Sequence, residues 1–443
     1  MSNITRTIDR TLLAWRDAPR RKPLVVRGAR QVGKSTAVQI FANRAFDSFV
    51  TINFERRRDY RGVFEADLDP KRILAELEIK ARATIKAGST LLFFDEIQDC
   101  PAAIASLRYF HEEMPELHVI AAGSLLEFAL EEVGMPVGRV EFAWLYPLSF
   151  SEYLNASGRG ALAEQMPTYD VEHGVTFSLT EVMVQEMYKA LHEYMIVGGM
   201  PEAVVTYLAT GSFAQSDDVL DQIATSFLDD IHKYARGDKQ IANVGLVLKR
   251  LFQFVGREVT YSTLGEADLG QRTATSVSLL EKAMLCHRVR SASPASLPLA
   301  GSAADKHFKC ILLDIGLARR MAGLESTALL RGSDLMAAYD GRAAEQFVGQ
   351  NLLAEGLAAG SEGRQLFCWI RPQKSAKAEV DYLLARHGQV LPIEVKSGST
   401  GRMRSLRVLM DEFANVKQGV CLKQINAPLQ QKGIVELPLF TRL

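Results

Sequence analysis

The sequence has few cysteines, and they are scattered along the chain. None of them belongs to a Cys-x-x-Cys pair, and the five positions are Cys100, Cys286, Cys310, Cys368 and Cys421. An odd and dispersed set suits neither a disulfide framework nor a zinc site. The histidines also show no spacing typical of metal ligands. We therefore expect reduced thiols and a cytoplasmic protein.

Long hydrophobic runs are absent as well. No stretch approaches the roughly 18 consecutive apolar residues that a membrane-spanning helix needs. The N-terminal residues 1–23 contain no apolar segment of the signal-peptide type. We expect neither a membrane span nor a secretory signal.

The charge is balanced. Lysine and arginine number 52, as do aspartate and glutamate, so the formal net charge is +0. No global field attracts the chain to nucleic acid, and any such contact would need a local basic patch. The 443 residues are 47% hydrophobic, which is ordinary for globular protein. At roughly 150 residues per domain, this length favours about three domains.

The N-terminal region alternates between predicted strands and helices. Apolar positions at Ile8, Leu12 and Trp15 have helical spacing. Helices are predicted over 5–19, 35–45 and 70–87, and strands over 24–26, 49–54, 91–94, 118–121 and 139–144. This alternation predicts a parallel sheet with helices on both faces. Residues 1–150 are expected to form one α/β domain.

The rest of the chain divides into two further expected domains. Residues 151–300 have a mainly helical pattern, with loops at 155–160 and 198–201. Its later elements are predicted as helices over 244–255, 261–270 and 273–283, then a strand over 286–290 and a loop over 291–301. Residues 301–443 are expected to form a small α/β domain. It contains a predicted helix over 342–355 and strands over 366–370, 380–384 and 390–395.

A glycine-containing loop follows the first strand and fits the pattern G-x-x-x-x-G-K-[ST] without deviation. Gly28 and Gly33 permit backbone angles and close approaches that a Cβ atom would prevent. Backbone N–H groups of such a loop point at phosphates, Lys34 can reach the β- and γ-phosphates, and Ser35 can bind Mg²⁺. The predicted nucleotide-binding residues are Gly28, Ala29, Arg30, Gln31, Val32, Gly33, Lys34, Ser35 and Thr36.

Two carboxylates end the strand predicted at 91–94. Asp95 is expected to hold Mg²⁺ through water and to complete the site with Ser35, and Glu96 is expected to orient and polarise the attacking water. The strand at 118–121 leads into Ser124, which could contact the γ-phosphate or the water. Alternatively, Ser124 caps the following helix.

These motifs resemble those of AAA-type ATPases with the P-loop NTPase fold. The segments Tyr146-Pro147-Leu148-Ser149-Phe150 and Gly198-Gly199-Met200-Pro201 resemble a prokaryotic branch with an AAA domain and a C-terminal domain of uncharacterised function. The resemblance extends over about residues 20–400 and implies binding of ATP and Mg²⁺. No guanine-reading NKxD motif is visible, which favours ATP over GTP. In such ATPases an arginine stabilises charge on the transferred phosphoryl group. Arg139 is the candidate, and a surface salt bridge is the alternative.

Residues 243–290 look like a winged helix-turn-helix. Its recognition helix would be 273–283, with Gln271, Arg272, Thr273 and Thr275 at its exposed start. In ATPases of this type such a fold often provides packing or oligomer contacts instead. DNA contact and structural packing therefore both remain open.

The C-terminal region carries a pattern of carboxylates and lysine on two predicted strands. Asp381 lies on the first strand, and Glu394 and Lys396 lie two residues apart on the returning strand, facing the same side. Glu345 lies on the preceding helix. This set resembles the PD-(D/E)XK nuclease pattern, although Val380 stands where that pattern has proline. The resemblance implies that Asp381 and Glu394 bind one or two Mg²⁺ ions and that Glu345 supports this metal site. It also implies that Lys396 stabilises developing charge or positions the attacking water. The alternative is an ion pair in a non-catalytic fold.

The sequence therefore favours a Mg²⁺-dependent ATPase whose nucleotide cycle controls its C-terminal domains. An ATP-gated DNA nuclease and a non-hydrolysing nucleotide switch remain alternatives. Besides ATP, the expected partners are DNA, another protein or a second copy of the chain, and no membrane.

Overall fold

A computed structural model describes residues 4–134, 138–265, 270–327, 341–356, 365–371, 378–399 and 403–443. The chain forms two compact units. Unit 1 comprises Met1–Pro147 with Lys282–Met284, and unit 2 comprises Leu148–Glu281 with Leu285–Leu443. The predicted domain boundary between residues 300 and 301 falls inside unit 2, between two strands that pair with each other.

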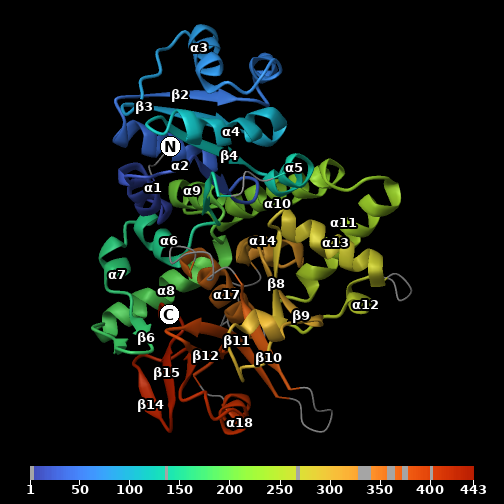
Figure 1. Ribbon diagram of the computed structural model, residues 1–443. Helices are drawn as coiled ribbons and strands as arrows, with labels where there is room; N and C mark the ends of the chain where they lie inside the picture. Colours follow the sequence, from blue (N-terminus) through green and yellow to red (C-terminus); the bar gives the residue numbers. More distant parts are fainter. Residues whose placement is uncertain are drawn as a thin grey trace. The chain divides into compact units, whose positions relative to one another are not determined.

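Unit 1 contains a five-stranded parallel sheet in the order β2-β3-β4-β1-β5. Figure 1 labels its strands β2, β3 and β4. Its strands are β1 (Leu24–Arg27), β2 (Ser48–Asn53), β3 (Thr90–Asp95), β4 (His118–Gly123) and β5 (Glu141–Trp144). Its helices are α1 (Ile8–Asp17), α2 (Lys34–Ala45), α3 (Pro70–Ala81), α4 (Pro101–Glu113) and α5 (Leu126–Val133), with 3₁₀ turns at Arg58–Phe64 and Ile97–Asp99. The predicted P-loop NTPase sheet with flanking helices is confirmed.

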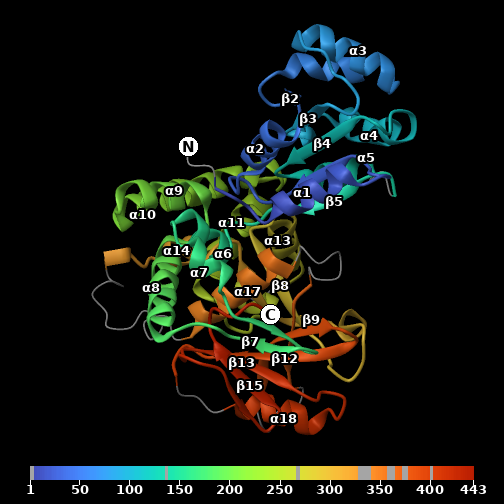
Figure 2. The ribbon, with the colours of Figure 1, turned by 90° about the vertical axis from the view of Figure 1, so that its left-hand side faces the viewer.

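The central strands of unit 1 are buried along their whole length. Every residue of β1, β3 and β4 is buried, as expected for parallel strands covered on both faces. Helix α1 buries Ile8, Leu12 and Trp15, the three positions that predicted it, and it contacts β5 (Figure 2). Because parallel strands have their carboxyl ends at one edge, the residues that follow β1, β3 and β4 come together there.

Unit 2 begins with helices and a short hairpin. These elements are α6 (Phe150–Ala156), α7 (Gly160–Glu164), β6 (Thr168–Asp170), β7 (Gly174–Thr176), α8 (Glu181–Val197), α9 (Pro201–Thr210), α10 (Phe213–Asp229), a 3₁₀ turn at Asp230–Lys233, α11 (Asp238–Gln253), α12 (Tyr261–Leu264) and α13 (Gly270–Lys282). The hairpin β6–β7 lies in a segment for which the sequence predicts helix. Residues 266–269 of the helix predicted over 261–270 lie outside the described residues.

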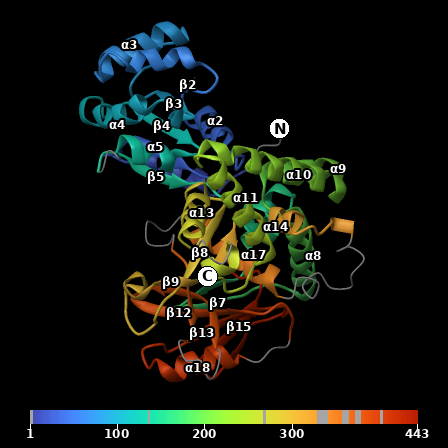
Figure 3. The same cartoon turned by 90° about the vertical axis from the view of Figure 1, so that its right-hand side faces the viewer.

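An eight-stranded mixed sheet forms the other half of unit 2, in the order β14-β15-β13-β12-β11-β10-β8-β9. Its strands are β8 (Cys286–Ser291), β9 (Ala304–Leu312), β10 (Phe367–Ile370), β11 (Glu379–Arg386), β12 (Gln389–Val395), β13 (Gly419–Lys423), β14 (Leu429–Gln431) and β15 (Ile434–Pro438). The accompanying helices are α14 (Ile315–Met321), α17 (Arg342–Gly356) and α18 (Arg404–Glu412), with a 3₁₀ turn at Leu299–Ser302. Helix α18 lies against β11 and β12 (Figure 3).

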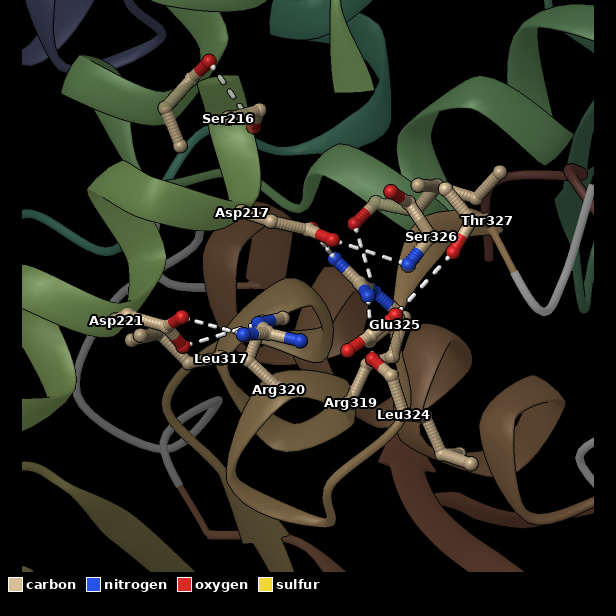
Figure 4. Close-up of polar contacts among 12 residues, drawn as sticks. Ser216, Asp217, Asp221, Leu317, Arg319, Arg320, Leu324, Glu325, Ser326 and Thr327 are labelled. Atoms are coloured by element: carbon tan, nitrogen blue, oxygen red, sulfur yellow. Dashed lines mark hydrogen bonds and ion pairs between the residues drawn. The ribbon is translucent and has the colours of Figure 1, made fainter. Parts of the chain in front are cut away.

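A buried ion pair joins α14 to α10 within unit 2. The Arg319 side chain is fully buried, and its guanidinium pairs with Asp217 and donates to the carbonyls of Ile196 and Leu324. Figure 4 shows Asp217 also accepting from the backbone of Ser326, at 3.0 Å. A buried arginine needs all these acceptors, because an unpaired charge inside a protein is costly.

The Gly198-Gly199 segment forms a tight junction between α8 and α9. Gly198 has φ +78°, a backbone conformation that residues with a Cβ atom rarely adopt. A Cβ atom on Gly199 would lie 2.3 Å from the carbonyl oxygen of Leu148. The Gly199 N–H instead donates to Asp314 Oδ2 at 2.6 Å, and Gln350 donates to the same carboxylate. These two glycines thus have a packing role.

None of the described helices is long and apolar enough to cross a lipid bilayer.

Candidate functional site

The loop between β1 and α2 forms a cradle whose shape depends on unusual backbone angles. Gln31 has φ +64° and Gly33 has φ +92°. A Cβ atom on Gly28 would come within 2.3 Å of the carbonyl oxygen of Leu145, so only glycine fits there. Helix α2 begins at Lys34, and its N-terminus therefore opens at the loop. Such a terminus attracts phosphate through its N–H groups and dipole.

Lys34 is folded back onto the loop. Its Nζ atom donates to the carbonyls of Gly28 at 3.0 Å and of Ala29 at 2.7 Å. Burial lowers the pKa of Lys34 to about 8, and the nearby carboxylates of Glu96 and Asp95 oppose that shift. A phosphate group would offer the ammonium stronger acceptors than two carbonyl oxygens do.

Ser35 and Asp95 meet at the carboxyl edge of the sheet. Ser35 Oγ donates to Asp95 Oδ1 at 2.7 Å. Asn53, the last residue of β2, donates from Nδ2 to the other carboxylate oxygen at 2.9 Å. The sequence pattern did not identify Asn53, because no motif marks it. Its position at the end of the strand next to β3 was the available signal.

Glu96 directly follows β3 in a left-handed conformation, with φ +51°. Its Oε2 atom accepts from Gln98 Nε2 at 2.7 Å. Gln98 also lies against the end of β4, because a Cβ atom on Gly123 would come within 2.2 Å of its Oε1 atom. Gln98 therefore holds the carboxylate of Glu96 near the sheet edge. Sequence reasoning missed Gln98 as well.

The two remaining predicted residues of unit 1 lie in different surroundings. Ser124 is buried immediately after β4. The N-cap position of α5 is Leu125 and has no side-chain cap, so the helix-capping alternative for Ser124 does not hold. Arg139 forms an exposed ion pair with Glu112, with Nε 2.7 Å from Oε1. Within its own chain, Arg139 thus has the surface contact that the sequence offered as the alternative.

Arg6 braces the loop from the N-terminal segment. Its guanidinium donates to the carbonyl of Val32 at 3.2 Å and to that of Tyr146 at 2.6 Å. The side chain is buried. Arg6 therefore ties the phosphate loop to the segment after β5. No sequence motif marks this residue, and only the fold brings it to the loop.

The N-terminal part of α13, the predicted recognition helix, is only partly exposed. Gln271, Arg272 and Thr275 are exposed, whereas Thr273 is fully buried. A Cβ atom on Gly265 would lie 1.8 Å from Thr273 Oγ1, so this threonine packs against the preceding turn. The prediction that Thr273 belongs to an exposed contact face is therefore wrong.

The C-terminal carboxylates surround a lysine that the sequence did not single out. Lys309 on β9 lies with Nζ 2.8 Å from Glu345 Oε1 and 2.9 Å from Asp381 Oδ1, and it also pairs with Glu379. Burial alone would lower the pKa of Lys309, but the three carboxylates raise it well above its usual value. This ammonium is thus held in its charged form.

Glu394 and Lys396 form a separate pair beside this cluster. Lys396 Nζ lies 2.5 Å from Glu394 Oε1. Burial, and to a smaller extent the repulsion from Asp381, raises the pKa of Glu394 to about 7. Among the described residues, one group of three side chains could hold a metal ion, with its ligand atoms within 4.8 Å of one another. This group is Asp170, Glu172 and His387, and it is largely exposed. The predicted ligands Glu345, Asp381 and Glu394 do not form such a group.

Comparison with family signatures assigns the N-terminal region. Residues 20–154 match an AAA domain family. Residues 188–328 and 340–440 match two families described as domains of unknown function, DUF8612 and DUF4143. No curated protein sequence matches the chain. This match supports a P-loop AAA-type ATPase domain in the N-terminal region, and ATP binding at the level of that family.

Three solved structures are similar over large parts of the chain. The Walker-type ATPase PABY2304 of Pyrococcus abyssi is 15% identical, with a TM-score of 0.45, covering 72% of this chain and 95% of that one. The ORC1 protein of Aeropyrum pernix in complex with DNA is 11% identical, with a TM-score of 0.29, covering 71% and 89%. PCH-2 of C. elegans is 12% identical, with a TM-score of 0.22, covering 46% and 54%.

Proposed function

We propose that unit 1 binds ATP with Mg²⁺ at the loop 28–36 and hydrolyses it. The observation that carries this proposal is the hydrogen bond between Ser35 and Asp95 beside the buried ammonium of Lys34. A hydroxyl, a carboxylate and an ammonium at the N-terminus of a helix are the groups that bind a metal-bound triphosphate. Lys34 and Asp95 are buried at this sheet edge and Ser35 is half-buried, which chance packing of surface residues would not produce.

Each residue has a distinct role in this proposal. The N–H groups of residues 28–36 bind the phosphates, and Lys34 leaves its carbonyl acceptors to contact the β- and γ-phosphates. Glu96, held by Gln98, accepts a proton from the attacking water. Ser124 contacts the γ-phosphate or that water from the end of β4.

The oxygen atoms at this edge fit Mg²⁺. Ser35 Oγ and Asp95 Oδ1 are hard oxygen donors 2.7 Å apart, and Mg²⁺ prefers such ligands. When bound, Mg²⁺ would neutralise charge on the phosphate oxygens. Asn53 orients the Asp95 carboxylate, so that Oδ1 faces Ser35.

Arg139 is proposed to act on a neighbouring copy of the chain. Its side chain is 44% exposed, and its partner Glu112 also pairs with Arg108. An exposed ion pair of this kind contributes little stability, typically about 0–1 kcal/mol. Arg139 could therefore exchange Glu112 for a phosphoryl group at low cost.

Turnover of ATP by purified full-length chain tests the proposal. Lys34→Ala is expected to weaken ATP binding, whereas Glu96→Gln is expected to bind ATP and lose turnover by about 10²–10⁴-fold. The wild-type chain could instead bind Mg²⁺-ATP tightly and turn it over no faster than Glu96→Gln does. That result would show that the chain is a non-hydrolysing nucleotide switch. If the ATP cycle controls unit 2, the rates of amide hydrogen exchange in unit 2 should change when nucleotide binds.

DNA contact by a winged-helix arrangement is the second proposal for this chain. The supporting observation is the order α11, α12, α13 and then the antiparallel pair β8–β9, to which Val259 adds a bridge at Phe308. Arg272 is exposed at the start of α13. Arg272→Ala is expected to weaken binding of labelled duplex DNA, with the exposed Arg257→Ala as the matched control. Equal affinities for both variants and wild type would reject this contact.

A further inference from the structure

Lys309 lies between Glu345 and Asp381, two of the carboxylates that the nuclease pattern assigns to a metal site. Its side chain is 2% exposed, on β9. The three carboxylates around it come from α17 (Glu345) and β11 (Glu379 and Asp381). An ammonium group has three donors in a tetrahedral arrangement, so three carboxylates can satisfy it completely.

The two oxygens of Asp381 and one oxygen of Glu345 already accept hydrogen bonds, whereas Glu394 Oε2 is buried with no hydrogen-bond partner. Asp381 Oδ1 accepts from Lys309 at 2.9 Å, and its Oδ2 accepts from the Val395 N–H at 2.8 Å. Glu345 Oε1 accepts from Lys309 at 2.8 Å. A divalent cation bound by these oxygens would have to lie close to the ammonium. At such a separation, two like charges in a buried place repel strongly.

The lysines also balance much of the negative charge. Lys309 faces Glu345, Glu379 and Asp381, while Lys396 pairs with Glu394. In a metal-dependent nuclease, the carboxylates supply net negative charge that attracts the cation. Here the chain itself places two ammonium groups among four carboxylates, and one of them, Lys309, already occupies the position among three of these carboxylates. The predicted metal site at Glu345, Asp381 and Glu394 therefore does not fit Mg²⁺.

We infer that Lys309 takes the place of the divalent cation in unit 2, and that the carboxylate cluster joins β9, α17 and β11 without hydrolysing phosphodiesters. The cluster acts as a fixed internal ionic junction, since removing either partner of a buried pair leaves an uncompensated charge. This inference concerns unit 2 only. Its failure would leave the proposed ATP site of unit 1 untouched, and the reverse also holds.

Binding of Mn²⁺ to the full chain without nucleotide tests the inference by electron paramagnetic resonance. All chains carry Asp95→Asn, so that unit 1 contributes no metal site. The chain with Lys309 intact is expected to bind no Mn²⁺ at this cluster at 1 mM free ion, about the weak-binding limit. Adding Lys309→Met is expected to create one Mn²⁺ site, and adding Asp381→Asn as well is expected to remove it. Lys309→Arg, which keeps the charge, is the matched control and is expected to bind none.

Two results of the Mn²⁺ experiment would overturn the inference. One is a Mn²⁺ ion bound by the chain with Lys309 intact and lost on Asp381→Asn. The other is a folded Lys309→Met chain that gains no Mn²⁺ site. Should Lys309→Met fail to fold, as circular dichroism would reveal, the first comparison decides alone. Cleavage of supercoiled DNA with Mg²⁺ or Mn²⁺ that disappears with Asp381→Ala would also overturn it.

Discussion

Ser35 and Asp95 are 60 positions apart in the sequence and share a hydrogen bond of 2.7 Å, with the hydroxyl donating to Oδ1. The bond connects the start of α2 to the end of β3. In the proposed ATP complex, both oxygens turn to the same metal ion. The two residues should therefore act as a unit.

Ser35→Ala and Asp95→Asn are each expected to lower Mg²⁺-dependent ATP turnover by about 10²-fold or more, because the first removes an oxygen ligand and the second removes the negative charge that helps to hold the ion. The double variant should lose little more than the worse single variant, since both changes damage the same ligand set. A coupled phosphate-release assay measures all three. Losses that multiply in the double variant would contradict a shared metal site.

The affinity for ATP should depend on pH through Lys34. The free chain holds this pKa at about 8 through burial, and bound phosphates would raise it. Above pH 8 the free lysine loses its proton, so binding must take one up. Affinity is then expected to be constant below pH 7 and to fall by up to about tenfold per pH unit above 8. Isothermal titration between pH 6.5 and 9.5, in buffers of different ionisation enthalpy, measures both affinity and proton uptake. Lys34→Arg, whose charge persists across this range, should show no such fall if it binds ATP.

Arg6→Ala should weaken ATP binding by about 10- to 100-fold, because hydrogen bonds from a charged group contribute about 1.5–3 kcal/mol. The change removes both contacts that brace the loop, to Val32 and to Tyr146. The matched control is Arg10→Ala, an exposed arginine on α1. Fluorescence titration with a labelled ATP analogue compares the two variants. Equal affinities would show that the loop holds its shape without Arg6.

Arg319 and Arg320 are neighbours on α14 that should differ sharply in their effect on stability. Arg319 is fully buried on Asp217, whereas Arg320 pairs with Asp221, which is 49% exposed. Arg319→Met is expected to destabilise unit 2 by about 3–5 kcal/mol, because it leaves a buried carboxylate unpaired. Arg320→Met should cost about 0–1 kcal/mol. Urea unfolding followed by circular dichroism gives both values, and similar losses for the two variants would contradict the assignment of the buried pair.

The sequence predicts those parts of the site that a motif marks. The loop 28–36 and Asp95-Glu96 follow from residue type and spacing, and the sheet that carries them follows from the alternation of strands and helices. No motif identifies Asn53 or Gln98. Their contacts depend on which strands are neighbours and on where each side chain points, and a motif gives neither.

Lys309 shows why the C-terminal cluster could not be predicted. Strand β9 was not predicted from the sequence, although the apolar residues Phe308, Cys310 and Leu312 occupy every second position along it. A lysine in such a pattern is expected to face solvent. Only the folded chain brings α17 and β11 to it, from 36 and 72 positions away. The same limit applies to Gly198 and Gly199, whose packing partners Asp314 and Leu148 are distant in sequence.

A calorimetric titration of ATP into the full-length chain, with Mg²⁺ and with EDTA, tests the central claim most directly. One ATP is expected to bind per chain in the presence of Mg²⁺, and the affinity should fall on removal of Mg²⁺ and on Asp95→Asn. Absence of binding with Mg²⁺, or an affinity unchanged by both EDTA and Asp95→Asn, would contradict a nucleotide–metal site at the ends of β1 and β3.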